Sequence, residues 1–303
     1  MAREMHEPVL SDEVLHYLKP VPGGRYIDAT ADGGGHAVRI IQAIAPDGKL
    51  LAIEWDEELF KHLGQRLKKE CSPFSKNYVL RRTSYSELGR IVRSLRFGPV
   101  KGVLFDLGLS SFHLEASRRG FSFQRDEPLD MRYSRTDLAE SAADMLAQRS
   151  RRELEHMLKD FGEERFSRAI AERIVAERRR QPIQRTGELV RIIRQATPSW
   201  YHRLRIHFAT RTFQALRIAV NREFEHIPEG LAAAAHALAP QGRIVTIAFH
   251  YREDALIKRF FRQPTIRPRF SSVVDPPLRP SAIERTRNPR ARSALLRVFE
   301  KQL

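Results

Sequence analysis

One stretch near the N-terminus constrains the fold more than any other, because it joins a strand-like run to three consecutive glycines. Residues 26–36 read Tyr-Ile-Asp-Ala-Thr-Ala-Asp-Gly-Gly-Gly-His, and apolar residues at helical spacing follow them. A strand, a glycine turn and a helix N-terminus in that order are typical of a nucleotide cradle in an α/β fold. Glycine lacks the Cβ that would otherwise keep a ligand away from the backbone. The same pattern also fits a tight strand-to-helix turn without any ligand.

The acidic residue at the end of the strand-like run indicates what kind of ligand the turn would hold. The Gly-x-Gly-x-x-Gly fingerprint of dinucleotide-binding proteins is absent, and a carboxylate at Asp28 is a poor neighbour for a pyrophosphate. Asp28 suits a cationic ligand better, such as the amino and sulfonium groups of S-adenosylmethionine (SAM). The residues therefore favour SAM over NAD.

Further strand-like runs follow, with helical patterns between them. They cover residues 49–54, 77–80, 100–107, 242–250 and 293–299. Strands alternating with helices predict a parallel α/β sheet whose ligands lie at the carboxyl ends of the strands. Asp28, Glu54 and Asp106 fall at such ends. Glu54 also lies 20 residues after Gly34 (54 − 34), the distance at which these folds place an acidic group on the ribose hydroxyls.

Between residues 112 and 208 the strand pattern stops. Four segments there have apolar residues at helical spacing, near 139–148, 150–160, 163–180 and 186–197,. Helical patterns continue from 210 to 238, and the proline- and arginine-rich tail over 263–292 is predicted to be largely irregular. We therefore expect an α/β core formed by 1–111 and 209–303, with an all-helical domain over 112–208 inserted into it.

The charge of the chain is high and unevenly placed. Lys and Arg number 53 against 37 Asp and Glu, a net charge of +16. Residues 148–222 hold 18 basic and 8 acidic side chains, net +10, and residues 243–303 hold 14 and 5, net +9. Two basic regions predict a polyanionic partner, with nucleic acid ahead of an acidic membrane surface. Solvated basic helix faces are the alternative.

Other features of the composition exclude several classes of protein. Cys71 is the only cysteine, so no internal disulfide can form, and no spacing is typical of a zinc site,. No apolar run is long enough to span a membrane, and residues 1–8 lack the apolar core of a secretory signal,. We expect a cytoplasmic protein that holds no metal.

The motifs together resemble one family over nearly the whole chain. In order they are His6-x-Pro-Val-Leu, Asp28-x-Thr, Gly34-Gly-His36, Leu50-Leu-Ala-Ile, Asp106-Leu-Gly-x-Ser-Ser111, Arg119-Gly-Phe-Ser-Phe, Pro128-Leu-Asp-Met-Arg132, Gly162-Glu-Glu-Arg-Phe166, Thr210-Arg-Thr-Phe-Gln-Ala-Leu-Arg-Ile218, Phe249-His250 and Asn288-Pro-Arg-Ala-Arg-Ser293. In this set the chain resembles the bacterial 16S ribosomal-RNA cytosine-N4 methyltransferases. The resemblance implies a Rossmann-like SAM-dependent methyltransferase sheet with an inserted helical substrate-recognition domain. It also implies 16S rRNA of the small ribosomal subunit as the partner, and it leaves open whether the protein forms a homodimer.

The same resemblance implies which residues form the site. Those matching the family's SAM site are Gly34, Gly35, His36, Glu54, Tyr85, Asp106 and His113. Three of them differ from the usual family residue, with Glu54 in place of Asp, Tyr85 in place of Phe and His113 in place of Gln. RNA contacts are expected among residues of the family-like segments outside the glycine turn, namely Arg132, Arg211, Asn221, His250 and Arg290. For each of these five, a structural salt bridge or helix cap is an equal alternative.

Asp106 is the candidate catalytic residue. The N4 amine of cytosine is a poor nucleophile because its lone pair is delocalised into the ring, so an enzyme must accept its protons and align it with the methyl sulfonium. Methylation at C5 would instead require a cysteine at the site, and Cys71 ends a predicted helix remote from the strand ends. The alternative function is a non-catalytic rRNA-binding assembly factor that retains a SAM site. A NAD-dependent oxidoreductase is a more distant third.

Overall fold

The computed structural model describes residues 8–303, so His6 of the first motif lies outside the described residues. The chain folds as two compact units. The first contains the residues up to Gly108 together with Phe224–Leu303, and the second is Leu109–Glu223. Helix α10 (Thr210–Val220), which the sequence pattern assigned to the core, lies in the second unit.

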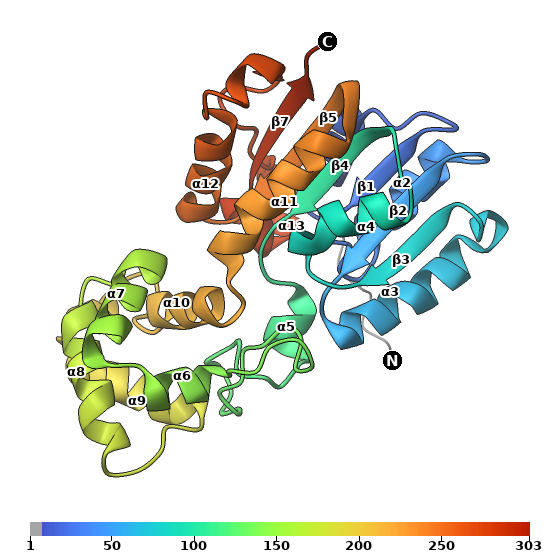
Figure 1. Ribbon diagram of the computed structural model, residues 1–303. Coiled ribbons are helices and arrows are strands. Elements are labelled where there is room, and N and C mark those ends of the chain that lie inside the picture. Colours follow the sequence, from blue (N-terminus) through green and yellow to red (C-terminus); the bar gives the residue numbers. More distant parts are fainter. Residues whose placement is uncertain (1–7) are drawn as a thin grey trace. The chain divides into compact units, whose positions relative to one another are not determined.

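The first unit is built on a seven-stranded sheet with the strand order β3-β2-β1-β4-β5-β7-β6 (Figure 1). Its strands are β1 Arg25–Asp28, β2 Lys49–Glu54, β3 Tyr78–Arg82, β4 Val100–Asp106, β5 Leu238–Ala248, β6 Phe270–Ser272 and β7 Leu295–Lys301. The pairs among β1 to β5 are all parallel. The predicted parallel α/β sheet is confirmed for these five strands, and their carboxyl ends share one edge.

The last two strands differ in direction from the first five. β7 is antiparallel to both β5 and β6, an orientation that the sequence pattern did not address. β6 and helix α13 (Ala282–Arg287) both lie in the tail that was expected to be irregular. β6 has only three residues, Phe-Ser-Ser, too few for an apolar alternation to show. Its pairing with the end of β7, Phe270 opposite Lys301, holds it as a strand.

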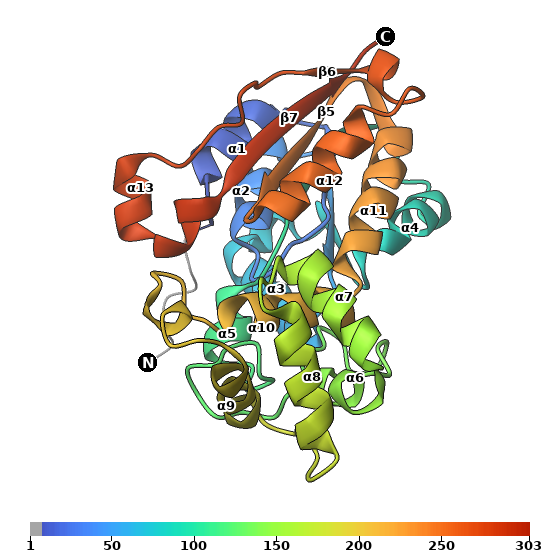
Figure 2. The ribbon, with the colours of Figure 1, turned by 90° about the vertical axis from the view of Figure 1, so that its left-hand side faces the viewer.

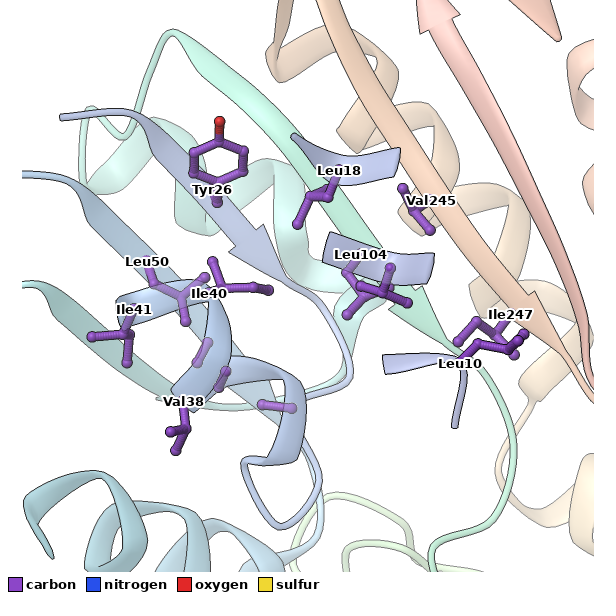
Figure 3. Close-up of a cluster of buried hydrophobic side chains, with 14 of the residues drawn as sticks. Leu10, Leu18, Tyr26, Val38, Ile40, Ile41, Leu50, Leu104, Val245 and Ile247 are labelled. Atoms are coloured by element: carbon purple, nitrogen blue, oxygen red, sulfur yellow. The ribbon is translucent and has the colours of Figure 1, made fainter. Parts of the chain in front are cut away.

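Helices cover both faces of this sheet. On one face α1 (Ser11–Leu18), α2 (Gly35–Ile44) and α3 (Glu57–Glu70) pack against the strands in one buried cluster. Figure 3 shows part of it, with Tyr26 and Leu104 of the sheet among the labelled side chains. On the other face α4 (Leu88–Ser94), α11 (Glu223–Ala237) and α12 (Tyr251–Phe261) form a second cluster. Each fully buried aliphatic side chain in these clusters contributes roughly 1.5–3 kcal/mol.

Local signals end the strands at the shared edge. After β2, the side chain of Asp56 accepts hydrogen bonds from the N–H groups of Glu58 and Leu59 and caps α3. Such a cap satisfies backbone donors that a helix start would otherwise leave unpaired. After β1, Gly34 takes a left-handed conformation and α2 begins at the next residue. The acidic residues that precede these turns therefore remain at the edge of the sheet.

The second unit is helical (Figure 2). Its helices are α5 Ser111–Glu115, α6 Ala142–Gln148, α7 Arg151–Gly162, α8 Ser167–Arg178, α9 Thr186–Ala196 and α10. Within it the structure contains no strand, only a single bridge between Pro128 and Arg185. Serines at the starts of α6 and α7 form reciprocal caps with the acidic residues three positions later,. The four predicted helical segments are all present, because each has apolar residues at helical spacing.

Membrane-spanning segments were also sought in the structure. Among residues 8–303, none of the helices combines the length and the apolar character that crossing a bilayer requires.

Candidate cofactor and active site

Three polar side chains meet at the ends of β1 and β4. Asp28 ends β1, Asp106 ends β4 and His36 lies in the first turn of α2. His36 Nε2 is 3.6 Å from Asp106 Oδ2. The backbone N–H of Asp106 donates to Thr30 Oγ1 at 2.6 Å, which ties the β4 end to the turn after β1. The sequence predicted Asp106 and His36 for one site, and the structure brings them together.

These side chains leave buried polar atoms without hydrogen bonds inside the described part of the chain. The atoms are Asp28 Oδ2, His36 Nε2 and Asp106 Oδ1. Asp28 is completely buried, and its other oxygen accepts only the N–H of Thr30, at 3.3 Å. A buried polar atom without a partner costs free energy, so such atoms commonly mark the position of a ligand. Two carboxyl oxygens and an imidazole nitrogen suit a cationic or hydrogen-bond-donating group.

Burial changes the protonation of Asp28. It raises the pKa of this carboxyl from 3.8 to about 7, the nearby carboxylates of Asp106 and Asp32 act in the same direction, and His36 and the Thr30 N–H oppose the rise. At neutral pH the carboxyl is therefore only partly ionised. A cation bound beside it would favour the ionised form, so we expect such a ligand to release a proton from Asp28 on binding below pH 7.

Glu54 ends β2 and faces the turn after β1. Its two carboxyl oxygens accept the backbone N–H groups of Asp32, at 2.8 Å, and of Asp56, at 2.7 Å. Burial raises the pKa of Glu54 to about 8, with the charges of Asp32 and Asp56 adding to the effect. Each oxygen keeps a second lone pair. Glu54 can therefore accept hydrogen bonds from a diol such as ribose while its backbone bonds hold it in place.

The glycines of the turn make room for neighbouring parts of the protein. Gly34 has φ +86°, a conformation that side chains rarely adopt, and a Cβ there would lie 3.0 Å from Leu63 of α3. A Cβ on Gly35 would meet the ring of Pro8 at 3.0 Å. Both glycines therefore permit a close approach between α2 and its neighbours. The predicted contact of Gly34 and Gly35 with SAM stays a prediction.

An aromatic group stands beside Glu54. The ring of Tyr85, in the turn that follows β3, packs edge-on against Phe105 at 5.7 Å and His226 at 6.3 Å. Trp55, the residue after Glu54, lies 5.3 Å from the same His226. Sequence reasoning selected Tyr85 but missed Trp55 and His226. An aromatic residue directly after an acidic strand end was the available signal for Trp55, whereas His226 comes from α11 and gave none.

His113 belongs to the second unit and is described with it. Its ring is buried and packs against Phe121 at 4.9 Å and Tyr133 at 4.8 Å. Phe121 and Tyr133 stack on each other at 5.5 Å, with their planes within 13°. The predicted contact between His113 and SAM stays a prediction.

Two of the residues expected to contact RNA have structural roles within the second unit. Asn221 is completely buried, donates to the carbonyl of Met131 at 2.8 Å and accepts the N–H of Tyr133 at 2.8 Å. Arg132 forms a two-pronged pair with Asp130, at 2.7 and 3.1 Å. Asn221 has no accessible surface for RNA, so its expected contact is corrected to a fold-stabilising one. Arg132 is held mainly by Asp130, the alternative that the sequence left open.

The other three substrate candidates remain partly accessible. Arg211 donates to the carbonyl of Glu163 at 3.2 Å. His250 caps α12 and lies 3.0 Å from the carboxylate of Glu253. Arg290 lies in a short turn after α13 and is half-buried. Their roles toward RNA stay predictions.

The sheet order and the site together define a class of protein. The sheet is Rossmann-like, with an antiparallel β7 beside β5. A glycine turn follows β1, and acidic residues lie at the ends of β1, β2 and β4. These features together are the fold of a SAM-dependent methyltransferase. The sequence comparison is more specific. Residues 3–302 match the model of the MraW methylase family, and the chain belongs to that family.

Close relatives are known by sequence. A protein of Thermomicrobium roseum called ribosomal RNA small subunit methyltransferase H is 46% identical, over 98% of this chain and 93% of that protein. A protein of the same name from Syntrophotalea carbinolica is 40% identical, over 99% of this chain and all of that protein. Among solved structures, an rRNA methylase from Streptococcus thermophilus covers 97% of this chain and 94% of its own, with 11% identity and a TM-score of 0.45.

Proposed function

We propose that this protein transfers a methyl group from SAM to the N4 amine of one cytidine in the decoding centre of 16S rRNA. One observation carries the proposal. In a chain of net charge +16, the carboxyls of Asp28 and Asp106 lie at adjacent strand ends, and each has an oxygen with no hydrogen-bond partner among residues 8–303. Support also comes from the relatives, which are named small-subunit rRNA methyltransferases. The small ribosomal subunit is the proposed partner, in the cytoplasm.

The residues at the sheet edge fit SAM group by group. Asp28 and Asp106 would face its cationic amino and sulfonium groups, and Glu54 would accept the ribose hydroxyls. Tyr85 and Trp55 offer aromatic surfaces for the adenine. The bound SAM supplies an electrophilic methyl group on a sulfonium sulfur. SAM has two cationic groups, and the two carboxyls have no arginine or lysine partner in the part of the chain that the structure describes. This match favours SAM over a dinucleotide.

Asp106 is proposed to act on the amine. When the N4 nitrogen gains a methyl group it must lose one proton, and a carboxylate at hydrogen-bond distance both orients the amine and accepts that proton. His36 Nε2 lies 3.6 Å from Asp106 Oδ2, on the side of the carboxylate that faces α2. Thr30 fixes the backbone of Asp106 through the 2.6 Å hydrogen bond. These residues position and deprotonate the amine, and the proposal includes no metal.

The substrate base must leave its stack to reach such a site. Enzymes that modify exocyclic groups act on flipped-out or single-stranded nucleotides. We propose that the second unit, together with the basic residues of 243–303, binds the surrounding RNA. Their net charges of +10 over 148–222 and +9 over 243–303 favour this assignment,.

Two experiments test the proposal. Mass spectrometry of 16S rRNA from cells with and without the protein should find one N4-methylated cytidine that depends on it, and purified protein should methylate either assembled small subunits or free rRNA. A protein that binds both SAM and rRNA but leaves the RNA unmodified would be an assembly factor. In calorimetry SAM should bind and NAD should not. Tight NAD binding without SAM binding would overturn the cofactor assignment.

A further inference from the structure

An exposed surface on the second unit combines apolar and cationic side chains. We call it the Trp200 surface, and it consists of Arg165, Trp200, Arg203, Leu204, Arg205 and Ile206. Trp200 is 44%, Leu204 50% and Ile206 55% exposed. Single exposed apolar residues are common and need no explanation. Three large ones within seven residues, separated by exposed arginines, form a patch of the kind that marks an interaction site.

The Trp200 surface is held in place by its buried neighbours. Tyr201, next to Trp200, is buried and donates its hydroxyl proton to Glu164 at 3.0 Å. Phe166 packs against both rings, at 4.9 Å from Tyr201 and 5.8 Å from Trp200. The guanidinium of Arg165 lies 5.3 Å from the centre of the Trp200 ring. Trp200 is therefore anchored from below while its ring remains accessible, and a cation is already beside it.

The charge around this surface is of one sign. Between Glu188 and Glu223 the chain has no acidic residue and contains the arginines Arg191, Arg194, Arg203, Arg205, Arg211, Arg217 and Arg222. Arg165, Arg203 and Arg205 make no salt bridge within residues 8–303. A protein partner or a second copy of this chain would need a carboxylate-rich face to match it.

We propose that the Trp200 surface binds single-stranded RNA, with a base stacked on Trp200 and phosphates held by Arg165, Arg203 and Arg205. An exposed indole ring among unpaired arginines is the combination that single-strand binding sites use, because every base has a stacking face and every nucleotide a phosphate. This inference rests on the proposed function and extends it. It assigns to the helical unit the unpaired RNA flanking the target cytidine.

Fluorescence tests the inference directly, because Trp55 and Trp200 are the only tryptophans. In a Trp55→Phe background an unstructured ten-nucleotide oligocytidylate should quench the emission of Trp200. Inorganic polyphosphate should bind by charge without comparable quenching, because it has no base to stack. If the two polyanions quench equally or neither quenches, stacking on Trp200 is overturned.

Variants in the full chain separate stacking from charge. Trp200→Ala should weaken oligocytidylate binding roughly 5- to 100-fold with an unchanged salt dependence, and Trp200→Phe should retain most of the affinity. Arg203→Gln with Arg205→Gln should instead lower the salt slope by about 2. Val21→Ala is the control, since Val21 is an apolar side chain 38% exposed in the first unit and lies outside both basic regions. It should leave binding unchanged, and an equal loss there would overturn the assignment.

Two further results are informative. If Trp200→Ala leaves RNA affinity intact but changes the molecular mass in solution, the surface joins copies of the chain and the inference is wrong. If RNA affinity is unaffected while the wild-type protein still methylates rRNA, this inference fails and the proposed function stands. If the wild-type protein does not bind RNA at all, both this inference and the proposed function are wrong.

Discussion

In the sheet unit, Asp28 and Glu54 lie at strand ends with no arginine or lysine partner among residues 8–303, and burial raises the pKa of each, to about 7 and about 8. In the helical unit, Asp126 and Asp130 are held by arginines. Hydrogen bonds from Arg185 and the N–H of Gly187 lower the pKa of Asp126. Burial opposes the change at Asp130, but hydrogen bonds and charge from Arg132 and Arg135 still lower its pKa.

This difference separates carboxylates that stabilise the fold from carboxylates that are available to bind a ligand. An arginine-paired carboxylate is compensated inside the protein, so its charge contributes to stability whether or not a ligand is present. An uncompensated buried carboxylate costs stability until a cation or hydrogen-bond donor reaches it. A molecule with 53 basic residues could have paired every such group. Within the described part of the chain Asp28 and Asp106 have no arginine or lysine partner, and this is the physical argument for a site at the sheet edge.

The largest expected effect is on turnover. Asp106→Asn keeps the size of the side chain but replaces an acceptor oxygen by a donor amide, which would face the N–H groups of the cytosine amine. Losing one positioned interaction of this kind typically costs on the order of 10²–10³ in rate. The rate should be measured with SAM and RNA both saturating, because Asp106 is also proposed to contact SAM.

A matched variant controls for the amide itself. Asp12, whose side chain is 87% exposed and pairs with Arg39 on the surface, carries the same substitution outside the proposed site. Asp12→Asn should turn over at the wild-type rate. Wild-type turnover by a saturated Asp106→Asn protein would mean that this carboxylate does not accept the N4 proton.

A second prediction uses the raised pKa of Asp28. The folded-state value of about 7 lies above the unfolded one of 3.8, so the contribution of this group to stability is full below about pH 4 and is lost as pH rises toward 7. The asparagine side chain of the Asp28→Asn variant is uncharged at every pH in this range. Without SAM, the stability of Asp28→Asn relative to the wild type should therefore increase from pH 4 to pH 8, by up to about 4 kcal/mol. Urea unfolding at a series of pH values measures it, and a pH-independent difference would contradict the assignment.

The opposite dependence of stability on pH is expected for Asp130→Asn. The pKa of Asp130 is lower in the folded protein than in the unfolded chain. Its carboxylate therefore stabilises the fold at any pH above the pKa of the unfolded chain, and this contribution is lost as the pH falls through the pKa of the folded protein. Asp130→Asn should cost about 1–3 kcal/mol at pH 7, because Arg132 then lies partly buried without its partner. The same unfolding experiment should show this cost shrinking below about pH 4. If Asp28→Asn and Asp130→Asn changed the free energy of unfolding in the same direction at pH 8, the contrast between the two units would be wrong.

How far the sequence predicted these features depends on whether their cause is local. The carboxyl ends of β1, β2 and β4 could be placed because apolar runs followed by acidic residues and turns mark strand ends, so Asp28, Glu54 and Asp106 were found. The pairing of β6 with β7 could not be read from three residues, since it depends on a partner nearly thirty positions away.

Part of the candidate site depends on long-range packing and could not be predicted from local sequence. His226 reaches Trp55 and Tyr85 from a helix that lies 171 and 141 residues further along the chain (226 − 55 and 226 − 85), and no pattern near any of these residues predicts that contact. Asn221 illustrates the opposite error. A polar residue inside a family-like motif suggested RNA, but its amide is used entirely by the backbone of Met131, Tyr133 and Arg217.

The smallest expected effect distinguishes structural from RNA-binding arginines within one run. Arg178 donates to the carbonyls of Leu146 and Arg149, both at 2.6 Å, and so stabilises the end of α6. Arg179 and Arg180 are exposed. Arg179→Gln with Arg180→Gln should lower the salt slope of RNA binding by up to about 2 and weaken binding only a few-fold at physiological salt, because each phosphate contact releases about one counterion. SAM affinity and thermal stability should stay at wild-type values. Arg178→Gln should do the reverse, lowering stability with little change in the salt slope. If the double variant leaves the slope unchanged, these two arginines belong to a solvated helix end, and the RNA surface of this unit lies elsewhere.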